Sequence, residues 1–197
     1  AYDRGGRLCR VTDSTGAVSE YTYNSRGQRT VVRNKIREDV WQETGYTYSP
    51  CGNIIKVAVS ADENGCGRKY AFTTYTYDGN GNVTGIQLPS GDEIHREYDL
   101  CDRITAEHYR EKNGSIDNRI TYHYDKNGNL TEVRYQDGHT ITMCYDVMDR
   151  LVSRTEGRGT TRMTYDLDGK LISQINPNEL QARGDAAKGF RYYYDSK

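Results

Sequence analysis

The chain has 197 residues and contains few large apolar rings, with two phenylalanines and one tryptophan, and only three prolines. It contains no apolar run of the 18 or more residues that a transmembrane helix needs, so no membrane span is predicted. Its 27 basic and 28 acidic residues are interspersed and give a net charge of -1. The basic patch typical of nucleic-acid binding is therefore missing, and no nucleic-acid partner is expected.

The cysteines do not form a metal-binding or disulfide pattern. There are five of them, and the sequence has no C-x-x-C pair, so a structural zinc site is not predicted. An odd number leaves at least one thiol unpaired within the chain. We expect mostly reduced, partly buried cysteines, with Cys144 buried in a strand beside Tyr145. The five are Cys9, Cys51, Cys66, Cys101 and Cys144.

Tyrosine and glycine are abundant instead, with 18 and 20 copies. Tyrosine favours strands, and glycine is typical of turns. Eight tyrosines begin one recurring motif: four residues later comes Gly or Asp, then a polar residue and usually an aliphatic one. The motifs are YDRGGRL, YNSRGQR, YSPCGNI, YDGNGNV, YDLCDRI, YDKNGNL, YDVMDRL and YDLDGKL, and they start at residues 2, 23, 48, 77, 98, 124, 145 and 165. A ninth copy begins at Tyr194.

Each copy of the motif predicts two strands and the turn between them. The residue two positions before the anchor tyrosine is often aromatic or apolar, as in Tyr122–Tyr124, and positions two apart share one face of a strand. Asp is expected to accept hydrogen bonds from backbone N–H groups one or two residues on, and Gly supplies positive φ. Asp102 and Asp149, which replace Gly, tolerate the same conformation. The register of the following strand stays open: either Leu130 or Val133 faces the core, and a bulge would shift it.

The repeats predict an all-β protein of consecutive antiparallel hairpins, with about 16 strands in one array over residues 1–197. A sheet of this size is expected to curl into a spiral rather than stay flat. The residues that define the repeat are Tyr2, Asp3, Gly6, Tyr23, Gly27, Tyr48, Gly52, Tyr77, Asp78, Gly81, Tyr98, Asp99, Tyr124, Asp125, Gly128, Tyr145, Asp146, Tyr165, Asp166 and Gly169. Longer excursions lie at 60–69 and 176–189, and one short helical turn is expected within 178–189.

Catalytic, cofactor and metal sites are not predicted. The stretch GNGNVTG (79–85) places its third glycine one residue too late for a G-x-G-x-x-G phosphate cradle, and no helix pattern follows. DKNGN (125–129) and DLDG (166–169) lack the ligand spacing and the glutamate of an EF-hand. The four histidines fall at unrelated repeat positions. Turn geometry explains these residues better than ligand chemistry does.

The repeats closely resemble the YD-repeat, or rearrangement-hotspot (Rhs), family. YDGNGNVT (77–84) and YDKNGNLT (124–131) match its pattern throughout, whereas Asn24, Ser49, Asp102, Asp149 and Arg29 depart from it. The resemblance implies an interior piece of a larger β-shell that encloses or presents a C-terminal effector domain. It also implies a non-enzymatic chain of a secreted or cell-surface bacterial protein, without cofactors. The Asp-Pro cleavage pattern of the family's toxins is absent, so no autoproteolytic residue is assigned.

The expected partners follow from this resemblance. They are the remainder of the parent chain, meaning further repeats and the enclosed domain. Exposed aromatic faces can also stack on sugar rings, so the alternative is a module that binds glycans or a cell surface through the loops 60–69 and 176–189. Two unpaired edge strands favour self-association of an isolated fragment. Asp99 and Arg103 are expected to bridge neighbouring repeats, and the tyrosines are expected to form a cross-strand ladder.

Overall fold

A computed structural model describes residues 1–38, 40–61, 69–178 and 189–194. Sixteen antiparallel strands form one sheet in which each strand lies beside its neighbours in the sequence. The predicted all-β fold of consecutive hairpins is therefore confirmed. The strands are β1 (Arg10–Thr12), β2 (Val18–Tyr23), β3 (Arg29–Arg37), β4 (Val40–Tyr48), β5 (Ile54–Ala61), β6 (Lys69–Tyr77), β7 (Val83–Gln87), β8 (Glu93–Tyr98), β9 (Ile104–Arg110), β10 (Asp117–Tyr124), β11 (Leu130–Tyr135), β12 (Thr140–Tyr145), β13 (Leu151–Glu156), β14 (Gly159–Tyr165), β15 (Leu171–Ile175) and β16 (Phe190–Arg191).

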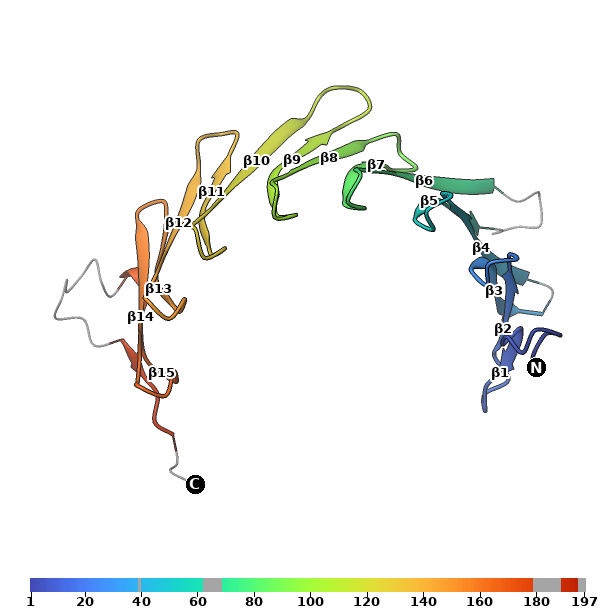
Figure 1. The fold of residues 1–197 in the computed structure, drawn as a ribbon, viewed down its shortest axis with the longest axis horizontal. Coiled ribbons are helices and arrows are strands. Elements are labelled where there is room, and N and C mark those ends of the chain that lie inside the picture. The colour runs from blue at the N-terminus through green and yellow to red at the C-terminus, as the bar shows by residue number, and fades with distance from the viewer. Residues whose placement is uncertain (39, 62–68, 179–188, 195–197) are drawn as a thin grey trace. The chain divides into compact units, whose positions relative to one another are not determined.

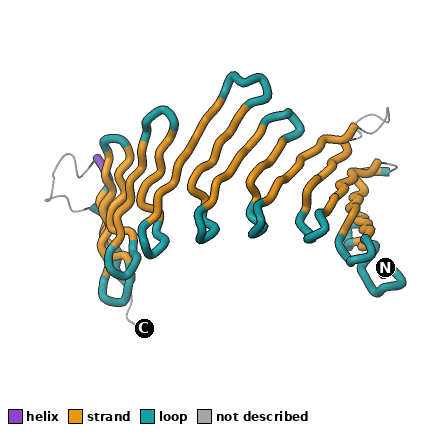
Figure 2. The backbone as a smooth tube through the Cα atoms, turned by 45° about the horizontal axis from the view of Figure 1, so that its top comes forward, coloured by secondary structure: helices purple, strands orange, loops and turns teal. Residues whose placement is uncertain are grey.

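The chain divides into two compact units, which are described separately. Unit 1 comprises residues 1–96 and 109–117, and unit 2 comprises residues 97–108 and 118–197. In each unit the hairpins follow one another in chain order (Figure 1). The turns of each unit alternate between the two ends of its strands (Figure 2). The first motif turn precedes β1, and in each unit the motif turns that follow even-numbered strands lie at one end of the strands. We call this the motif edge.

In unit 1 the side chains separate onto two faces. Tyr75 pairs with Ile86, which pairs with Ile94, and these residues share what we call the tyrosine face. On the opposite face, the threonine face, Thr76 pairs with Gly85 and Gly85 pairs with His95. The tyrosine face is thus the more apolar one in this part of unit 1.

In unit 2 the same pattern settles the register that the sequence left open. Tyr122 pairs with Val133, which pairs with Ile141 on the tyrosine face. Val133 and Ile141 are buried, whereas Leu130 is only half-buried. The register shifts between His123 and Tyr124, so one extra residue lies on β11 opposite this point. The suspected bulge is therefore present.

The same bulge recurs where other motifs begin. The register shifts just before the anchor tyrosine in the hairpins of Tyr23, Tyr48, Tyr77, Tyr145 and Tyr165. A bulge bends the strand and increases its local twist. Each of these hairpins therefore receives the same bend at the same place in the repeat.

The sheet of each unit is a single layer with few buried side chains. Among the described residues, the extensive contacts within each unit join strands that are consecutive in the chain. Apart from Gly85, the buried described residues are Val18, Ser60, Ala106, Val133 and Ile141. A fold with so small a core depends on backbone pairing and on contacts between neighbouring repeats more than a two-layer fold does.

Candidate functional site: the joint between repeats

The motif turn has the same backbone geometry in all eight copies. The residue after the anchor tyrosine donates its backbone N–H to the carbonyl four residues on, as Asp78 does to Asn82 at 3.0 Å. It also accepts a bond from the backbone N–H three residues on, as Asp78 does from Gly81 at 3.2 Å. These two bonds close a tight loop. Gly81 has a φ of 94°, in the left-handed region that glycine adopts at no steric cost.

The aspartate carboxylate holds this loop from inside. Asp125 Oδ1 accepts the backbone N–H groups of Asn127 and Asn129 at 2.9 and 2.8 Å, and Oδ2 accepts the Asn129 amide at 3.0 Å. The donors lie two and four residues on, so the sequence-based expectation of one or two residues was only partly right. Asn24 accepts from Arg26 and Gln28 in the same way, which explains why an amide replaces the carboxylate there.

These bonds lower the pKa of several motif aspartates. The side-chain amide of Asn82 is the main cause of the lowered pKa of Asp78, and the Arg103 guanidinium is the main cause for Asp99. For Asp146 the backbone N–H of Arg150 contributes most to the lowered pKa. In each case the donors favour the charged carboxylate over the neutral acid.

The anchor tyrosine reaches back to the preceding repeat. Its hydroxyl donates to the backbone carbonyl of the residue two positions after the Gly or Asp of the previous motif turn. The oxygen–oxygen distances run from 2.6 to 3.0 Å for the seven bonds Tyr23–Leu8, Tyr48–Arg29, Tyr77–Ile54, Tyr124–Ile104, Tyr145–Leu130, Tyr165–Leu151 and Tyr194–Leu171. Burial raises the pKa of Tyr77, Tyr124 and Tyr145, so these hydroxyl groups stay neutral donors to a higher pH than a free tyrosine does. We call this bond, with the basic contact described next, the tyrosine joint.

A basic side chain completes the joint by reaching forward from its own turn to the turn and the anchor tyrosine of the next repeat. Arg150 donates from Nε to Asp146 Oδ2 at 2.7 Å within its own turn, and from Nη1 to the carbonyl of Asp166 at 3.0 Å in the next turn. Its guanidinium carbon also lies 4.9 Å from the centre of the Tyr165 ring. Such a contact contributes about 0.5–1 kcal/mol at an exposed site. Arg7, Arg103 and Lys170 lie over Tyr23, Tyr124 and Tyr194 in the same way.

The expected bridge by Asp99 and Arg103 is only half right. The two side chains pair at 2.7 Å within one turn, and Arg103 alone reaches the next repeat through the Tyr124 ring. The sequence predicted a ladder of tyrosine rings. It did not predict the hydrogen bond that the anchor hydroxyl donates to a backbone carbonyl of the preceding repeat. One signal for that bond is present in the sequence, because all the anchors are tyrosine although phenylalanine would fill the same space.

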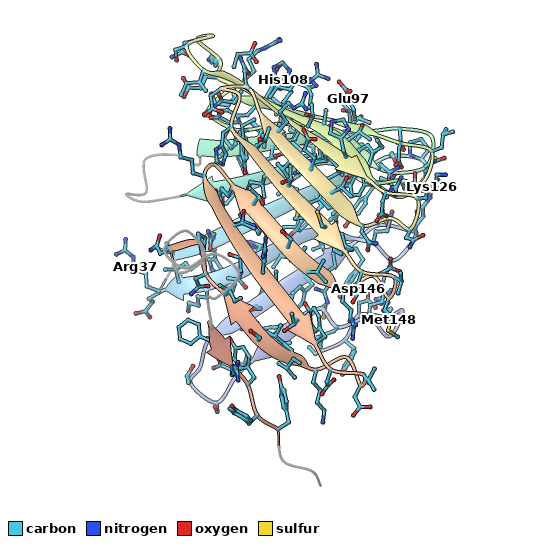
Figure 3. The ribbon with its side chains drawn as sticks, turned by 90° about the vertical axis from the view of Figure 1, so that its left-hand side faces the viewer. Arg37, Glu97, His108, Lys126, Asp146 and Met148 are labelled. Atoms are coloured by element: carbon cyan, nitrogen blue, oxygen red, sulfur yellow. The ribbon has the colours of Figure 1, made fainter. Side chains whose placement is uncertain are left out.

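The two substitutions of Gly by Asp have a structural account. Asp102 and Asp149 have φ values of 60° and 59°, so the prediction that Asp adopts the left-handed conformation is confirmed. Asp149 Oδ1 accepts the side-chain amides of Asn127 and Asn129 at 2.8 and 2.6 Å. These two bonds come from the preceding motif turn and offset the backbone strain. Figure 3 places Lys126, Asp146 and Met148, from these two turns, along one edge of unit 2.

The cysteines and the long excursions differ in part from the sequence-based predictions. Cys144 is exposed, so its predicted burial was wrong: β12 alternates, and Met143 and Tyr145 point to the other face. The described cysteines Cys9, Cys51, Cys101 and Cys144 are free, and Cys66 lies outside the described residues. Cys51 and Cys101 are exposed too, so the expected partial burial holds only for Cys9. Most of the two long excursions, including the expected helical turn at 178–189, also lies outside them.

The remaining predicted motif residues lie where the repeat pattern puts them along the chain. Tyr2 forms an isolated bridge with Leu8 and is largely exposed. Tyr98 ends β8, and Asp166 closes the last motif turn with Lys170. In the described ranges, no three His, Cys, Asp or Glu side chains gather as metal ligands, and no helix is long and apolar enough to span a membrane.

The single-layer sheet, the shared turn geometry and the tyrosine joint define a β-hairpin repeat protein. A family model for the RHS repeat matches residues 2–35, 77–113 and 124–161, which is more than half of the chain. The chain therefore belongs to the RHS repeat family. A search of curated proteins finds no match.

Several solved structures share the fold. The crystal structure of TcdB2-TccC3 has a TM-score of 0.64 at 15% identity and covers 98% of this chain and 12% of that chain. The same complex without its hypervariable C-terminal region has a TM-score of 0.62 at 16% identity over 98% and 12%. TcdB2-TccC3-Cdc42 has a TM-score of 0.61 at 15% identity over 87% and 11%. The chain thus spans about an eighth of the length of these proteins, and the likeness is one of fold.

We predict that the hydroxyl group of an anchor tyrosine stabilises the fold and that the hydroxyl of its neighbour does not. Tyr77→Phe removes the donor to Ile54 and should lower the free energy of unfolding by about 1 kcal/mol. Tyr75→Phe is the matched control, because Tyr75 lies on the same face of β6 and its hydroxyl has no hydrogen-bond partner in the described part of the chain. Urea denaturation measures both. An equal loss in the two variants would contradict the joint.

Stability should also fall in acid. The folded-state pKa values of Asp78, Asp99 and Asp146 lie below their ordinary values, so their stabilising contribution is present above about pH 4 and is lost as the pH drops towards the folded pKa values. Denaturation midpoints between pH 7 and pH 3 measure this loss. Asp146→Asn, which imitates the natural Asn24 turn, should show a weaker dependence on pH than the unchanged chain. An identical pH profile would exclude this carboxylate as a cause.

Proposed function

We propose that this chain is a structural segment of the wall of a larger RHS-repeat shell, which encloses or presents an effector domain encoded elsewhere in the parent protein. The observation that carries the proposal is the single-layer sheet built from one repeated joint. Such a sheet extends by adding hairpins, and each addition needs only its neighbour. In this proposal residues 1–197 form one array of about eight repeats, and the chain performs no catalysis of its own.

The motif edge of unit 2 supports a position inside a larger assembly. Leu100, Val147 and Leu167 occupy the same place in three motif turns and are 102%, 98% and 99% exposed. The corresponding residues in unit 1 are Arg4, Ser25, Pro50 and Gly79. Lys126 occupies the same place in the fourth motif turn of unit 2. Three fully exposed aliphatic side chains at one repeat position are costly in water and favour a covered surface. We propose that other parts of the parent protein cover this edge.

The likeness to TcdB2-TccC3 supports the proposed context only at the level of the fold. In this proposal the parent is a secreted or cell-surface bacterial toxin component, and its shell shields the enclosed domain from solvent. Binding of glycans or a cell surface through the excursions 60–69 and 176–189 stays a prediction, because most of both segments lies outside the described residues.

Limited proteolysis of the intact parent protein tests the shell. The region that the array encloses should resist a protease concentration that digests the same region expressed without the array. Weakening the wall by Tyr145→Phe, which removes the bond to Leu130, should speed cleavage of the enclosed region. Equal digestion rates with and without the array would refute enclosure. That result would not contradict the tyrosine joint, because urea denaturation of the Tyr77→Phe and Tyr75→Phe variants tests the joint separately.

A further inference from the structure

Asn113 and Gly114 form an Asn-Gly pair at the tip between β9 and β10, in the part of that hairpin that belongs to unit 1. The described residues contain two further Asn-Gly pairs, at 80–81 and 127–128, both in motif turns. Glycine has no Cβ to shield its backbone nitrogen, so the side-chain amide of a preceding asparagine is open to attack by that nitrogen. The three pairs have similar backbones, with glycine φ values between 73° and 95°. Differences between them therefore come from the surrounding contacts.

The side-chain carbonyl of Asn113 is turned forward along the chain. Asn113 Oδ1 accepts the backbone N–H of Ser115 at 2.9 Å and lies 2.7 Å from the Ser115 hydroxyl oxygen. An asparagine bound in this way to the residue two positions on turns its Cγ towards the backbone nitrogen of the residue in between. Here that nitrogen belongs to Gly114.

The Ser115 hydroxyl is placed to stabilise an attack on Asn113. It has one proton and two acceptors, because Ser115 Oγ also lies within bonding distance of the Glu111 carboxylate. The charged carboxylate holds that proton more strongly than the neutral amide does. When Gly114 attacks, negative charge develops on Asn113 Oδ1, which then becomes a charged acceptor as well. A donor already placed where charge develops lowers the barrier to reaction.

The motif turns hold their asparagines in place. Asp125 Oδ1 accepts the backbone N–H of Asn127 at 2.9 Å, and the Asn127 amide donates to Asp149 Oδ1 at 2.8 Å in the next turn. The second bond must break before the amide can turn towards its glycine. Asp78 Oδ1 accepts the backbone N–H of Asn80 at 2.9 Å in the same way.

The tip that carries Asn113 has fewer such restraints. Residues 112–117 are exposed, and Glu111, which takes the place of the motif aspartate, accepts the Ser115 hydroxyl with its carboxylate. Gly114 donates its N–H to the Glu111 carbonyl at 2.8 Å, and equivalent bonds at 3.2 Å close the two motif turns. Opening of an exposed tip costs little free energy. Gly114 is therefore freed for reaction more often than the glycine of a braced turn.

We propose that Asn113 is a site of spontaneous deamidation, a modification that needs only hydroxide and water. Hydroxide removes the proton of Gly114 N, and the nitrogen then attacks Asn113 Cγ. The bond from Cγ to the side-chain nitrogen breaks, and the nitrogen takes a proton from water and leaves as ammonia, which regenerates hydroxide. A cyclic succinimide remains, and water opens it at either carbonyl carbon to give aspartate or isoaspartate. This proposal does not rest on the proposed shell function.

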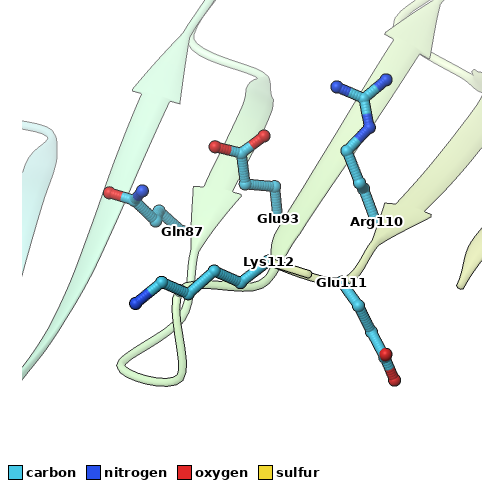
Figure 4. A pocket seen from close by; sticks show the side chains of 6 residues that line it. Gln87, Glu93, Arg110, Glu111 and Lys112 are labelled. Atoms are coloured by element: carbon cyan, nitrogen blue, oxygen red, sulfur yellow. The ribbon is translucent and has the colours of Figure 1, made fainter. Parts of the chain in front are cut away.

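Deamidation changes a contact between two hairpin tips of unit 1. Asp92, at the tip between β7 and β8, accepts the backbone N–H of Lys112 at 3.1 Å and the Tyr109 hydroxyl at 3.3 Å. Figure 4 shows Lys112 running along that tip and Glu111 pointing away from it. Isoaspartate at position 113 lengthens the main chain by one atom directly after Lys112, and either product adds a negative charge near Glu111. The modification should therefore loosen the contact between Asp92 and Lys112.

Peptide mapping by mass spectrometry tests the proposal on the chain aged at mildly alkaline pH. In the folded chain Asn113 should deamidate at least about tenfold faster than Asn80 and Asn127. The control is the same chain aged in urea, where the contacts are lost and the three pairs should react at similar rates. Equal rates at the three positions in the folded chain would overturn the proposal. A lead of Asn113 that persists in urea would do the same, because it would come from sequence alone.

The contribution of the hydroxyl is tested by Ser115→Ala. This variant should slow deamidation of Asn113 in the folded chain about tenfold, the effect of losing one hydrogen bond to a developing charge. Thr15→Ala is the matched control, because it removes a hydroxyl that bonds to Asp13 in another exposed turn of unit 1 and should leave the rate at Asn113 unchanged. Equal rates in the two variants would refute the stabilisation by Ser115.

Hydrogen exchange of the aged chain tests the consequence for the two tips. The backbone N–H of Lys112 should exchange faster after deamidation than in the fresh chain, because its bond to Asp92 is weakened. Unchanged exchange at Lys112 would contradict the loosening of this contact.

Discussion

The fold depends on one hydrogen bond that recurs between consecutive repeats, from an anchor tyrosine hydroxyl to a backbone carbonyl. A single-layer sheet buries little apolar surface, so contacts between hairpins replace a central core. The acceptor is a backbone atom, and it therefore survives a change of side chain. Arg29 shows this directly: it departs from the aliphatic pattern, yet its carbonyl accepts the Tyr48 hydroxyl at 2.6 Å. The basic side chain that lies over the next tyrosine ring then holds in place the ring that carries the hydroxyl donor.

The motif turn tolerates substitution for a related reason. Its function is to bring backbone groups into position, and several side chains can support the same backbone. Asn24 replaces an aspartate and keeps both acceptor bonds. Asp149 replaces a glycine at positive φ and receives two amide donors from the turn before it. Substitutions in one turn are thus offset within that turn or by its neighbour, which is the coupling expected of a linear repeat protein.

Much of the fold was predictable from the sequence, because period, turn chemistry and strand alternation all indicated the same hairpin. The joint was predictable only in part. The aspartate and glycine act within a few residues, and their roles follow from local rules. The partner of the tyrosine hydroxyl lies 14 to 23 residues away and depends on the register, which the bulge before each anchor shifts. Cys144 was misjudged because strand alternation places it opposite Tyr145.

A sheet built from one repeated joint extends by adding hairpins, and each addition needs only its neighbour. Amide hydrogen exchange of the Tyr145→Phe variant tests the tyrosine joint most directly. If the hydroxyl couples one hairpin to the next, exchange should quicken in β11 to β13 and stay unchanged in hairpins several repeats away. Uniform quickening along the whole chain, or no change near Leu130, would contradict the account.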